Sequence, residues 1–347
     1  MPNTFDPNAA AAPDSGLFGL PFDAAESDVL VLPVPFDATT SYRKGAALGP
    51  QAVARASRQV DLYDLEYGRF YERGIHLLPE HERIAKLNAE ATRLAQGVID
   101  VGGAIEGDEL LGRALGRVNE IGAELNRIVH DAVAEILEQD KLPVVLGGDH
   151  AVPFGAWQAC AEQYAGFGIL HFDAHADLRA AYEGFEWSHA SILHNALERI
   201  EGVERLVQVG IRDLCEAEHD YIAAQEGRVR VLYDRRWARA RMAGDDLREL
   251  AQKYIRRLPK TVWVTFDVDG LDPALCPGTG TPVPGGLQWS EALMWLELLS
   301  KSGRRVLGVD LVEVAPSPAP AGTDSWDANV GARLLYKLIG CALATRG

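Results

Sequence analysis

The stretch FGILHFDAHAD, residues 167–177, decides the fold of this chain. Its first six residues form a short apolar run without regular polar alternation, as expected for a strand buried on both faces of a sheet. Asp173, His175 and Asp177 follow directly. Because ligands of open α/β sheets bind beyond the carboxyl ends of the strands, this segment predicts a buried parallel strand with a functional site at its end.

Runs of the same kind recur along the chain and alternate with helical patterns. The further strands are predicted at 29–34, 74–78, 142–146, 205–209, 228–233, 262–266 and 305–309. Apolar residues recur with helical spacing over 121–137, and residues 289–299 and 327–343 also fit helices. Repeated strand and helix alternation implies right-handed crossovers and a mostly parallel sheet covered on both faces.

We expect one folded domain over residues 28–347, because no internal repeat or linker interrupts it. Residues 1–27 are rich in Ala, Pro, Asn and Asp without a clear period. That composition predicts an arm that is loose or packs on a neighbouring subunit.

The composition bears on partners and location. A formal charge of -16 disfavours a nucleic-acid partner or an anionic membrane surface, which both need a basic footprint, and suits a small cationic substrate. The four cysteines form no CxxC pair, which fits a reducing compartment. No apolar run approaches the roughly 20 residues that span a bilayer, and the first residues lack a secretory pattern. We therefore expect a soluble, cytoplasmic protein.

Three polar clusters follow predicted strands: GGDH at 147–150, DAHAD at 173–177 and DVDGLD at 267–272. Carboxylates and imidazoles that converge at one sheet edge would repel one another unless cations lay between them. Oxygen and imidazole ligands suit Mn²⁺ best, with Fe, Co, Ni or Zn as alternatives. The predicted metal ligands are His150, Asp173, His175, Asp177, Asp267 and Asp269.

Six ligands exceed what one open catalytic metal site holds, so we expect two ions. Two metals roughly 3.5–4 Å apart can share one water and lower its pKa towards neutrality, which yields a hydroxide nucleophile. Each cluster alone has an ordinary alternative. An Asp-x-His-x-Asp run often only hydrogen-bonds at a strand end, and Asp149 after two glycines could cap a helix or support a ligand.

The ordered motifs resemble the arginase and agmatinase family of ureohydrolases. They are VPFDATTSYRKGAALGPQAV at 34–53, GGDHA at 147–151, FDAHADL at 172–178, WSHAS at 187–191, FDVDGLDPALCPGTGTPVPGGL at 266–287 and DLVEVAPSP at 310–318. The resemblance covers nearly all of residues 29–347. It implies a three-layer α/β/α fold with a mostly parallel eight-stranded sheet, and it implies trimers or hexamers.

The resemblance also implies roles for single residues. One Mn²⁺ would be held by His150, Asp173, Asp177 and Asp267, and the other by Asp173, His175, Asp267 and Asp269. Asp177 would also orient the hydroxide. Glu313 resembles the family's guanidinium-binding carboxylate, and His189 resembles its acid/base histidine, which protonates the departing amine. Without the family, Glu313 reads as a loop residue and His189 as a helix-start residue.

Some positions depart from the family pattern. Ala151 stands where the family usually has Ser, and Ala190 where it has Gly. An arginase would show a Thr/Ser-rich stretch where residues 179–187 lie, and Asp at the place of Cys215. These differences argue against arginase activity. The resemblance also argues against a formiminoglutamate hydrolase, because such enzymes generally lack a His at the place of His189. The stretches GTGTPVPGG and VEVAP are most similar to agmatinase.

The sequence therefore predicts a hydrolase that converts agmatine to putrescine and urea. A guanidino-acid hydrolase, with Arg179 meeting the carboxylate of guanidinobutyrate, and a guanidine hydrolase remain alternatives. A non-enzymatic alternative is a catalytically silent subunit of an oligomer. Such a subunit would be expected to have lost metal ligands, whereas all six predicted ligands are present here. Amide deacetylation with a single zinc, known on a related fold, fits the paired ligand set poorly.

Overall fold

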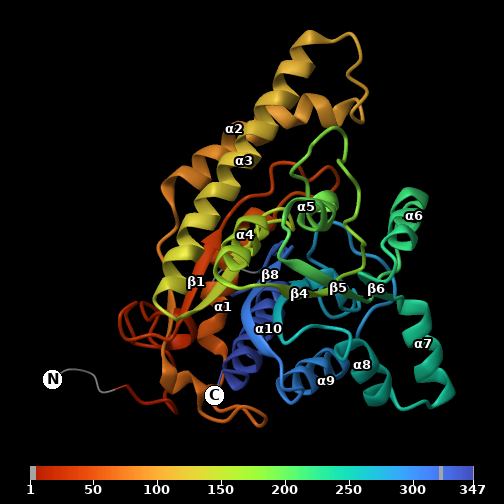
Figure 1. Ribbon diagram of the computed structural model, residues 1–347. Helices are drawn as coiled ribbons and strands as arrows, with labels where there is room; N and C mark the ends of the chain where they lie inside the picture. Colours follow the sequence, from red (N-terminus) through yellow and green to blue (C-terminus); the bar gives the residue numbers. More distant parts are fainter. Residues whose placement is uncertain (1–4, 320–322, 347) are drawn as a thin grey trace.

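Eight parallel strands form one sheet at the centre of the molecule (Figure 1). This computed structural model describes residues 5–319 and 323–346. The strand order is β2-β1-β3-β8-β7-β4-β5-β6, and every pairing is parallel. The strands are β1 Val29–Val34, β2 Ile75–Leu77, β3 Leu142–Gly147, β4 Phe167–Phe172, β5 Val203–Val209, β6 Val229–Leu232, β7 Thr261–Asp267 and β8 Arg305–Val312.

Alternate residues of the central strands enter two separate cores. In β3, Val144 belongs to one core and Val145 to the other, because successive side chains point to opposite faces. The first core is closed by α1 Gly49–Ala56, α8 Leu247–Ile255, α9 Trp289–Ser300 and α10 Trp326–Ala344. The second is closed by α2 Glu82–Asp100, α3 Glu109–Glu138, α4 Phe154–Gln163 and α5 Ile192–Arg199. This confirms the predicted three-layer α/β/α fold.

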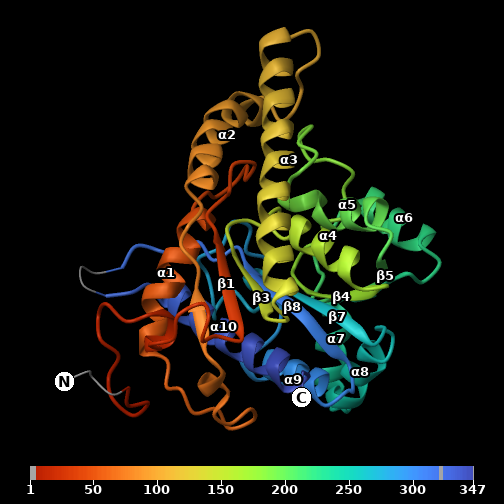
Figure 2. The same cartoon turned by 60° about the vertical axis from the view of Figure 1, so that its left-hand side comes forward.

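Helix α3 is longer than the apolar stripe at 121–137 predicts. It begins after Asp108, whose carboxylate accepts hydrogen bonds from the backbone N–H groups of Leu110 and Leu111. Its N-terminal part projects with α2 beyond the sheet (Figure 2), and there Leu111 and Leu115 continue the apolar stripe as partly buried residues. The helices predicted at 289–299 and 327–343 correspond to α9 and α10 within one residue at each end.

Part of the predicted N-terminal arm packs on its own chain. Leu17, Phe18 and Leu20 are buried in the first core, and the Phe18 N–H donates to Ser57 Oγ. Residues 1–4 lie outside the described residues, and whether any of the arm covers a neighbour stays a prediction. Among the described residues, no helix is long and apolar enough to cross a membrane.

The strand order brings the predicted site residues together. Strands β3, β8, β7 and β4 are adjacent in the middle of the sheet. Their carboxyl ends lead into His150, Glu313, Asp267 and Asp173, respectively. Four segments far apart in sequence therefore place their polar side chains at one edge.

Candidate active site

His150 lies among three carboxylates. Its Nδ1 is 3.0 Å from Asp173 Oδ2, 3.1 Å from Asp177 Oδ2 and 3.5 Å from Asp267 Oδ2. All four side chains are buried. Without a cation, three carboxylates facing one imidazole leave negative charge uncompensated in a region of low dielectric.

A second group shares Asp173 with the first. His175 Nδ1 is 3.1 Å from Asp269 Oδ2 and 3.4 Å from Asp173 Oδ1. These three residues, and separately His150, His171, Asp173 and Asp177, offer donor atoms that lie within 4.8 Å of one another. The six predicted metal ligands thus meet in one place, which we call the acidic floor: His150, Asp173, His175, Asp177, Asp267 and Asp269.

The pKa values of the acidic floor show how strongly its charges interact. Burial, together with Asp173, raises the pKa of Asp177 to about 7. Burial and the neighbouring Asp269 and Asp173 raise the pKa of Asp267 well above its usual value. Burial opposes charge on His175, yet Asp269 and Asp173 raise its pKa to about 12. These carboxylate and imidazole groups retain extra protons because they lie so close together. Divalent cations bind such groups by displacing their protons, so the site fits metal ions.

Backbone groups fix the carboxylates. The Asp269 N–H donates to Asp267 Oδ1 at 2.8 Å, and the Ala174 N–H donates to Asp269 Oδ1 at 3.0 Å. Asp177 has a φ of 54° and Glu313 a φ of 63°. Non-glycine residues rarely adopt this left-handed region, and such strain concentrates at functional sites.

A buried relay orients His150, and the sequence analysis missed it. His150 Nε2 is 2.8 Å from Thr265 Oγ1, and the Thr265 hydroxyl donates to Asp310 Oδ1 at 2.6 Å. The Trp263 Nε1–H donates to the other Asp310 oxygen. Because the threonine proton goes to Asp310, Nε2 of His150 carries the ring proton and Nδ1 is free to bind a metal.

His171 supports Asp173 from within β4. Gln208 Nε2 donates to His171 Nδ1, so Nε2 of His171 donates to Asp173 Oδ2 at 2.7 Å. One signal could have found these residues. His171, Thr265 and Asp310 are polar positions inside otherwise apolar runs, and buried polar groups require partners.

Glu313 and His189 both lie next to the acidic floor. Glu313 Oε1 accepts a hydrogen bond from the His150 N–H at 2.9 Å, and burial next to Asp149 raises its pKa well above the usual value. His189 is buried enough that its pKa falls to about 4, with cationic His175 contributing, so its ring is neutral at pH 7. Within the described part of the chain, His189 Nδ1 has no hydrogen-bond partner.

A cavity of about 210 Å³ opens above the acidic floor. His175, Asp177 and His189 line it, whereas Glu313 is buried and is not among its lining residues. Ala190 also lines it, and Ala151 is buried beside Asp149, to which its N–H donates. We call the remaining charged and aromatic lining residues the rim: Tyr42, Arg179, Tyr182, Asp213 and Glu218.

Charges on the rim partly offset one another. Arg179 Nε is 3.8 Å from Glu218 Oε2, and its guanidinium lies over the ring of Tyr182. Glu218, on α6 Glu216–Ala224, also accepts from the backbone N–H groups of Leu178 and Cys215. Asp213 is placed beside His175 by a backbone bridge. Two carboxylates against one arginine leave the rim net negative.

Helix α3 holds the loop that carries His189. Asn119 donates to the Gly184 carbonyl and accepts from the Glu186 N–H. The Glu186 carbonyl in turn accepts from Ser191 Oγ and Asn195 Nδ2. Gly122 leaves room for Trp187, since a Cβ at position 122 would lie 2.7 Å from the Trp187 Cβ. Helix α3 therefore contacts the segment next to the candidate acid/base residue.

Comparison with known proteins gives the family. A sequence model of the arginase family matches residues 27–341. The N(1)-aminopropylagmatine ureohydrolase of Synechocystis sp. is 32% identical over 319 residues, covering 91% of this chain and 89% of that protein. The agmatinase of Bacillus cereus is 32% identical over 291 residues, covering 84% of each chain.

A solved structure shows the same fold. The agmatine ureohydrolase of Thermoplasma volcanium superposes with a TM-score of 0.69 at 23% identity, covering 98% of this chain and 96% of that one. Together with the sequence relatives and the match over most of the chain, this shows that the protein is a ureohydrolase enzyme belonging to the arginase family.

Proposed function

We propose that this enzyme uses two divalent metal ions to hydrolyse the guanidino C–N bond of an agmatine-type substrate, releasing urea and an amine. Convergence of the six residues of the acidic floor carries the proposal. Asp173 and Asp267 would bridge the ions, His150 and Asp177 would complete one site, and His175 and Asp269 the other. When bound, the ions would activate a water for attack, and Mn²⁺ suits this donor set best.

The chain's own residues would orient the reactants. Asp177, fixed by its left-handed backbone, would accept a hydrogen bond from the attacking water. Glu313, with one oxygen held by the His150 N–H, would bind the guanidinium, whose positive charge favours the ionised carboxylate. Neutral His189 would accept a proton and pass it to the departing amine.

The rim suggests which tail the substrate carries. Asp213 and Glu218 outnumber Arg179, so a cationic amine tail is favoured at this end of the cavity. That is the tail of agmatine and of N(1)-aminopropylagmatine, the substrates in the names of the two relatives. Arg179 supports a second candidate substrate, a guanidino acid such as guanidinobutyrate. Arg179 could bind the carboxylate of that substrate if its contact with Glu218 were broken.

Urea release with Mn²⁺-loaded enzyme tests the proposal. Agmatine, N(1)-aminopropylagmatine, guanidinobutyrate, arginine and guanidine would be compared by kcat/KM, with Asp177→Asn as the inactive control. We expect the amine-tailed substrates to lead. A preference for guanidinobutyrate would move the assignment to the second candidate, and no turnover with Mn, Ni, Co, Fe or Zn would refute the catalytic proposal.

Metal content per chain separates an enzyme from a silent subunit. We expect about two ions per chain, because six donors exceed the needs of one open site. We further propose a cytoplasmic homotrimer or homohexamer, which light scattering of the full chain would check.

A further inference from the structure

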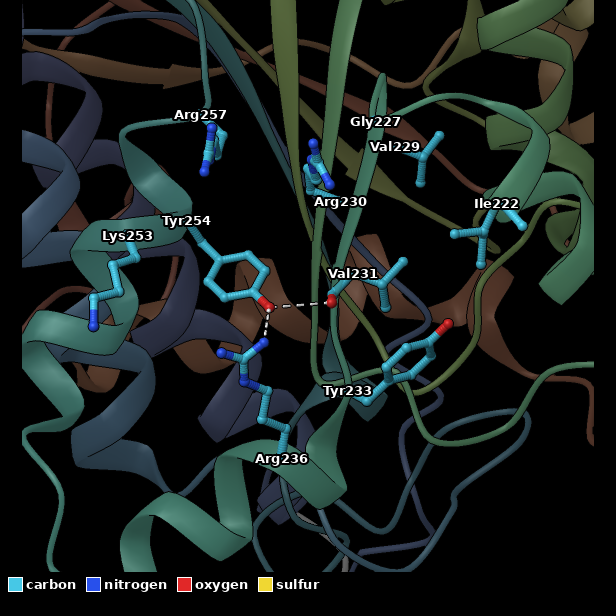
Figure 3. A pocket seen from close by; sticks show the side chains of 11 residues that line it. Ile222, Gly227, Val229, Arg230, Val231, Tyr233, Arg236, Lys253, Tyr254 and Arg257 are labelled. Atoms are coloured by element: carbon cyan, nitrogen blue, oxygen red, sulfur yellow. Dashed lines mark hydrogen bonds between the residues drawn. The ribbon is translucent and has the colours of Figure 1, made fainter.

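A second, larger cavity of about 560 Å³ lies at the far edge of the sheet, beside β6 (Figure 3). Edge strand β6, the C-terminal end of α6, the start of α7 Asp234–Ala243 and helix α8 line this cavity, which is open to solvent. Its walls combine basic, aromatic and apolar side chains: Ile222, Ala223, Gly227, Val229, Arg230, Val231, Tyr233, Arg236, Lys253, Tyr254 and Arg257. None of them belongs to the acidic floor or the rim.

Four of these side chains are cationic and none is acidic, in a chain whose formal charge is -16. Lys253 pairs with Glu249, and Arg236 donates to the Tyr254 hydroxyl at 3.2 Å. In the part of the chain that the structure describes, no carboxylate pairs with Arg230, Arg236 or Arg257. Figure 3 shows the arginine side chains arranged around the Tyr254 ring. Clustered cations without counter-charges repel one another, and a bound anion relieves that repulsion.

The shape and surface of this cavity limit the ligand. Its volume falls in the range of about 300–1,000 Å³ typical of small-molecule sites. Several arginines favour a multiply charged anion such as a phosphate chain, which they bind in forked geometry. Tyr233, together with apolar Ile222 and Val229, offers a surface for a flat ring. We propose that this pocket binds a nucleoside di- or triphosphate.

Helix α6 connects the pocket to the rim. Glu218, near its start, lines the cavity above the acidic floor, and Ile222, one turn later, lines the basic pocket. Glu218 is the buried residue of this helix, and Tyr221 and Ile222 pack against the second core. The two cavities therefore share one helix, which lines both of them.

Calorimetry with the metal-loaded full chain tests binding independently of catalysis. The probes are ADP, ATP, inorganic pyrophosphate and citrate. We expect saturable binding of ADP or ATP, and weaker binding of pyrophosphate and citrate, which are multiply charged but lack the ring. In Arg230→Gln/Arg257→Gln, loss of two charge-assisted contacts should weaken nucleotide binding by about tenfold or more.

Arg235→Gln is the matched control, because Arg235 is exposed on the neighbouring helix α7 Asp234–Ala243 and does not line the pocket. It should bind nucleotide as the parent does. All variants replace exposed side chains, and thermal unfolding would verify that they fold. Absence of saturable nucleotide binding, equal weakening in the control, or a change of oligomer mass in the double variant would each overturn the proposal, the last by showing that a second copy of the chain occupies the pocket.

Discussion

The acidic floor and the rim meet at one cavity but are built in different ways. The floor stands on the ends of three strands in the middle of the sheet, β3, β7 and β4, and backbone N–H groups hold its carboxylates. The rim comes from loops and from α6, and the loop that runs from Tyr182 of the rim to His189 depends on distant α3 through Asn119. The sheet thus fixes the proposed metal ligands in place. The proposed substrate tail is instead surrounded by loops and a helix, which can vary without disturbing the sheet. Changes in the floor should abolish metal binding, and changes in the rim should alter only substrate use.

The largest effect should come from Asp267→Asn. The amide keeps the shape but removes the negative charge of a proposed bridging ligand, so metal content should fall below one ion per chain and urea release by more than about a hundredfold. Elemental analysis and a urea assay would measure both.

Asp272→Asn, in the same motif but outside the acidic floor, is the control and should keep both ions. If Asp267→Asn also retained two ions per chain, the bridging role would be wrong.

The sequence predicts the floor well because its signals are local. Each ligand follows an apolar run, and parallel strands carry such residues to one edge, so Asp173 and Asp267 could be paired without coordinates. The supports of the floor are harder to find, because Thr265 and Asp310 lie on different strands and become partners only through the strand order. The hydrogen bonds from Asn119 to residues 184 and 186 could not be predicted, since they join a partly buried helix position to a loop without periodicity.

A second, smaller effect should follow from Thr265→Val. Valine has the same shape but cannot accept the His150 Nε2 proton, so the ring loses its fixed tautomer. Loss of such supporting contacts typically lowers metal affinity about 10- to 100-fold. Competition with a chelator would measure the affinity.

The matched control is Thr261→Val, at the opposite end of β7, where the hydroxyl donates to the Gly166 carbonyl away from the floor. Equal metal affinity in the two variants would show that the relay does not orient His150.

Acidity should weaken metal binding at the acidic floor. Metal ions bind deprotonated ligands, and the metal-free site holds protons because the pKa of Asp177 is about 7 and that of His175 about 12. Metal uptake at pH 7.5 should therefore release protons from His175, and also from His150 and Asp267, whose pKa values are likewise raised well above the ordinary range. Below pH 7 protonated Asp177 must also give up its proton, so affinity should fall further, by about tenfold per pH unit for each proton displaced.

Titration of Mn²⁺ into weakly buffered metal-free protein with a pH indicator would count the protons. Uptake without proton release, or affinity constant between pH 5.5 and 8, would contradict this description of the acidic floor.

The smallest effect should come from Asn119→Ala, which tests whether the rim can be disturbed alone. The change removes two hydrogen bonds from α3 to residues 184 and 186, both partly accessible to water, so the loss should be modest. The Glu186 carbonyl would still accept from Ser191 and Asn195, but the segment that carries His189 would be less firmly held. We expect kcat/KM to fall about three- to tenfold while metal content stays at the parent level. Arg113→Ala, at an exposed position of the same helix, should leave both unchanged. A loss of metal in Asn119→Ala would mean that floor and rim are not separate, and that α3 supports the strand ends as well as the loop.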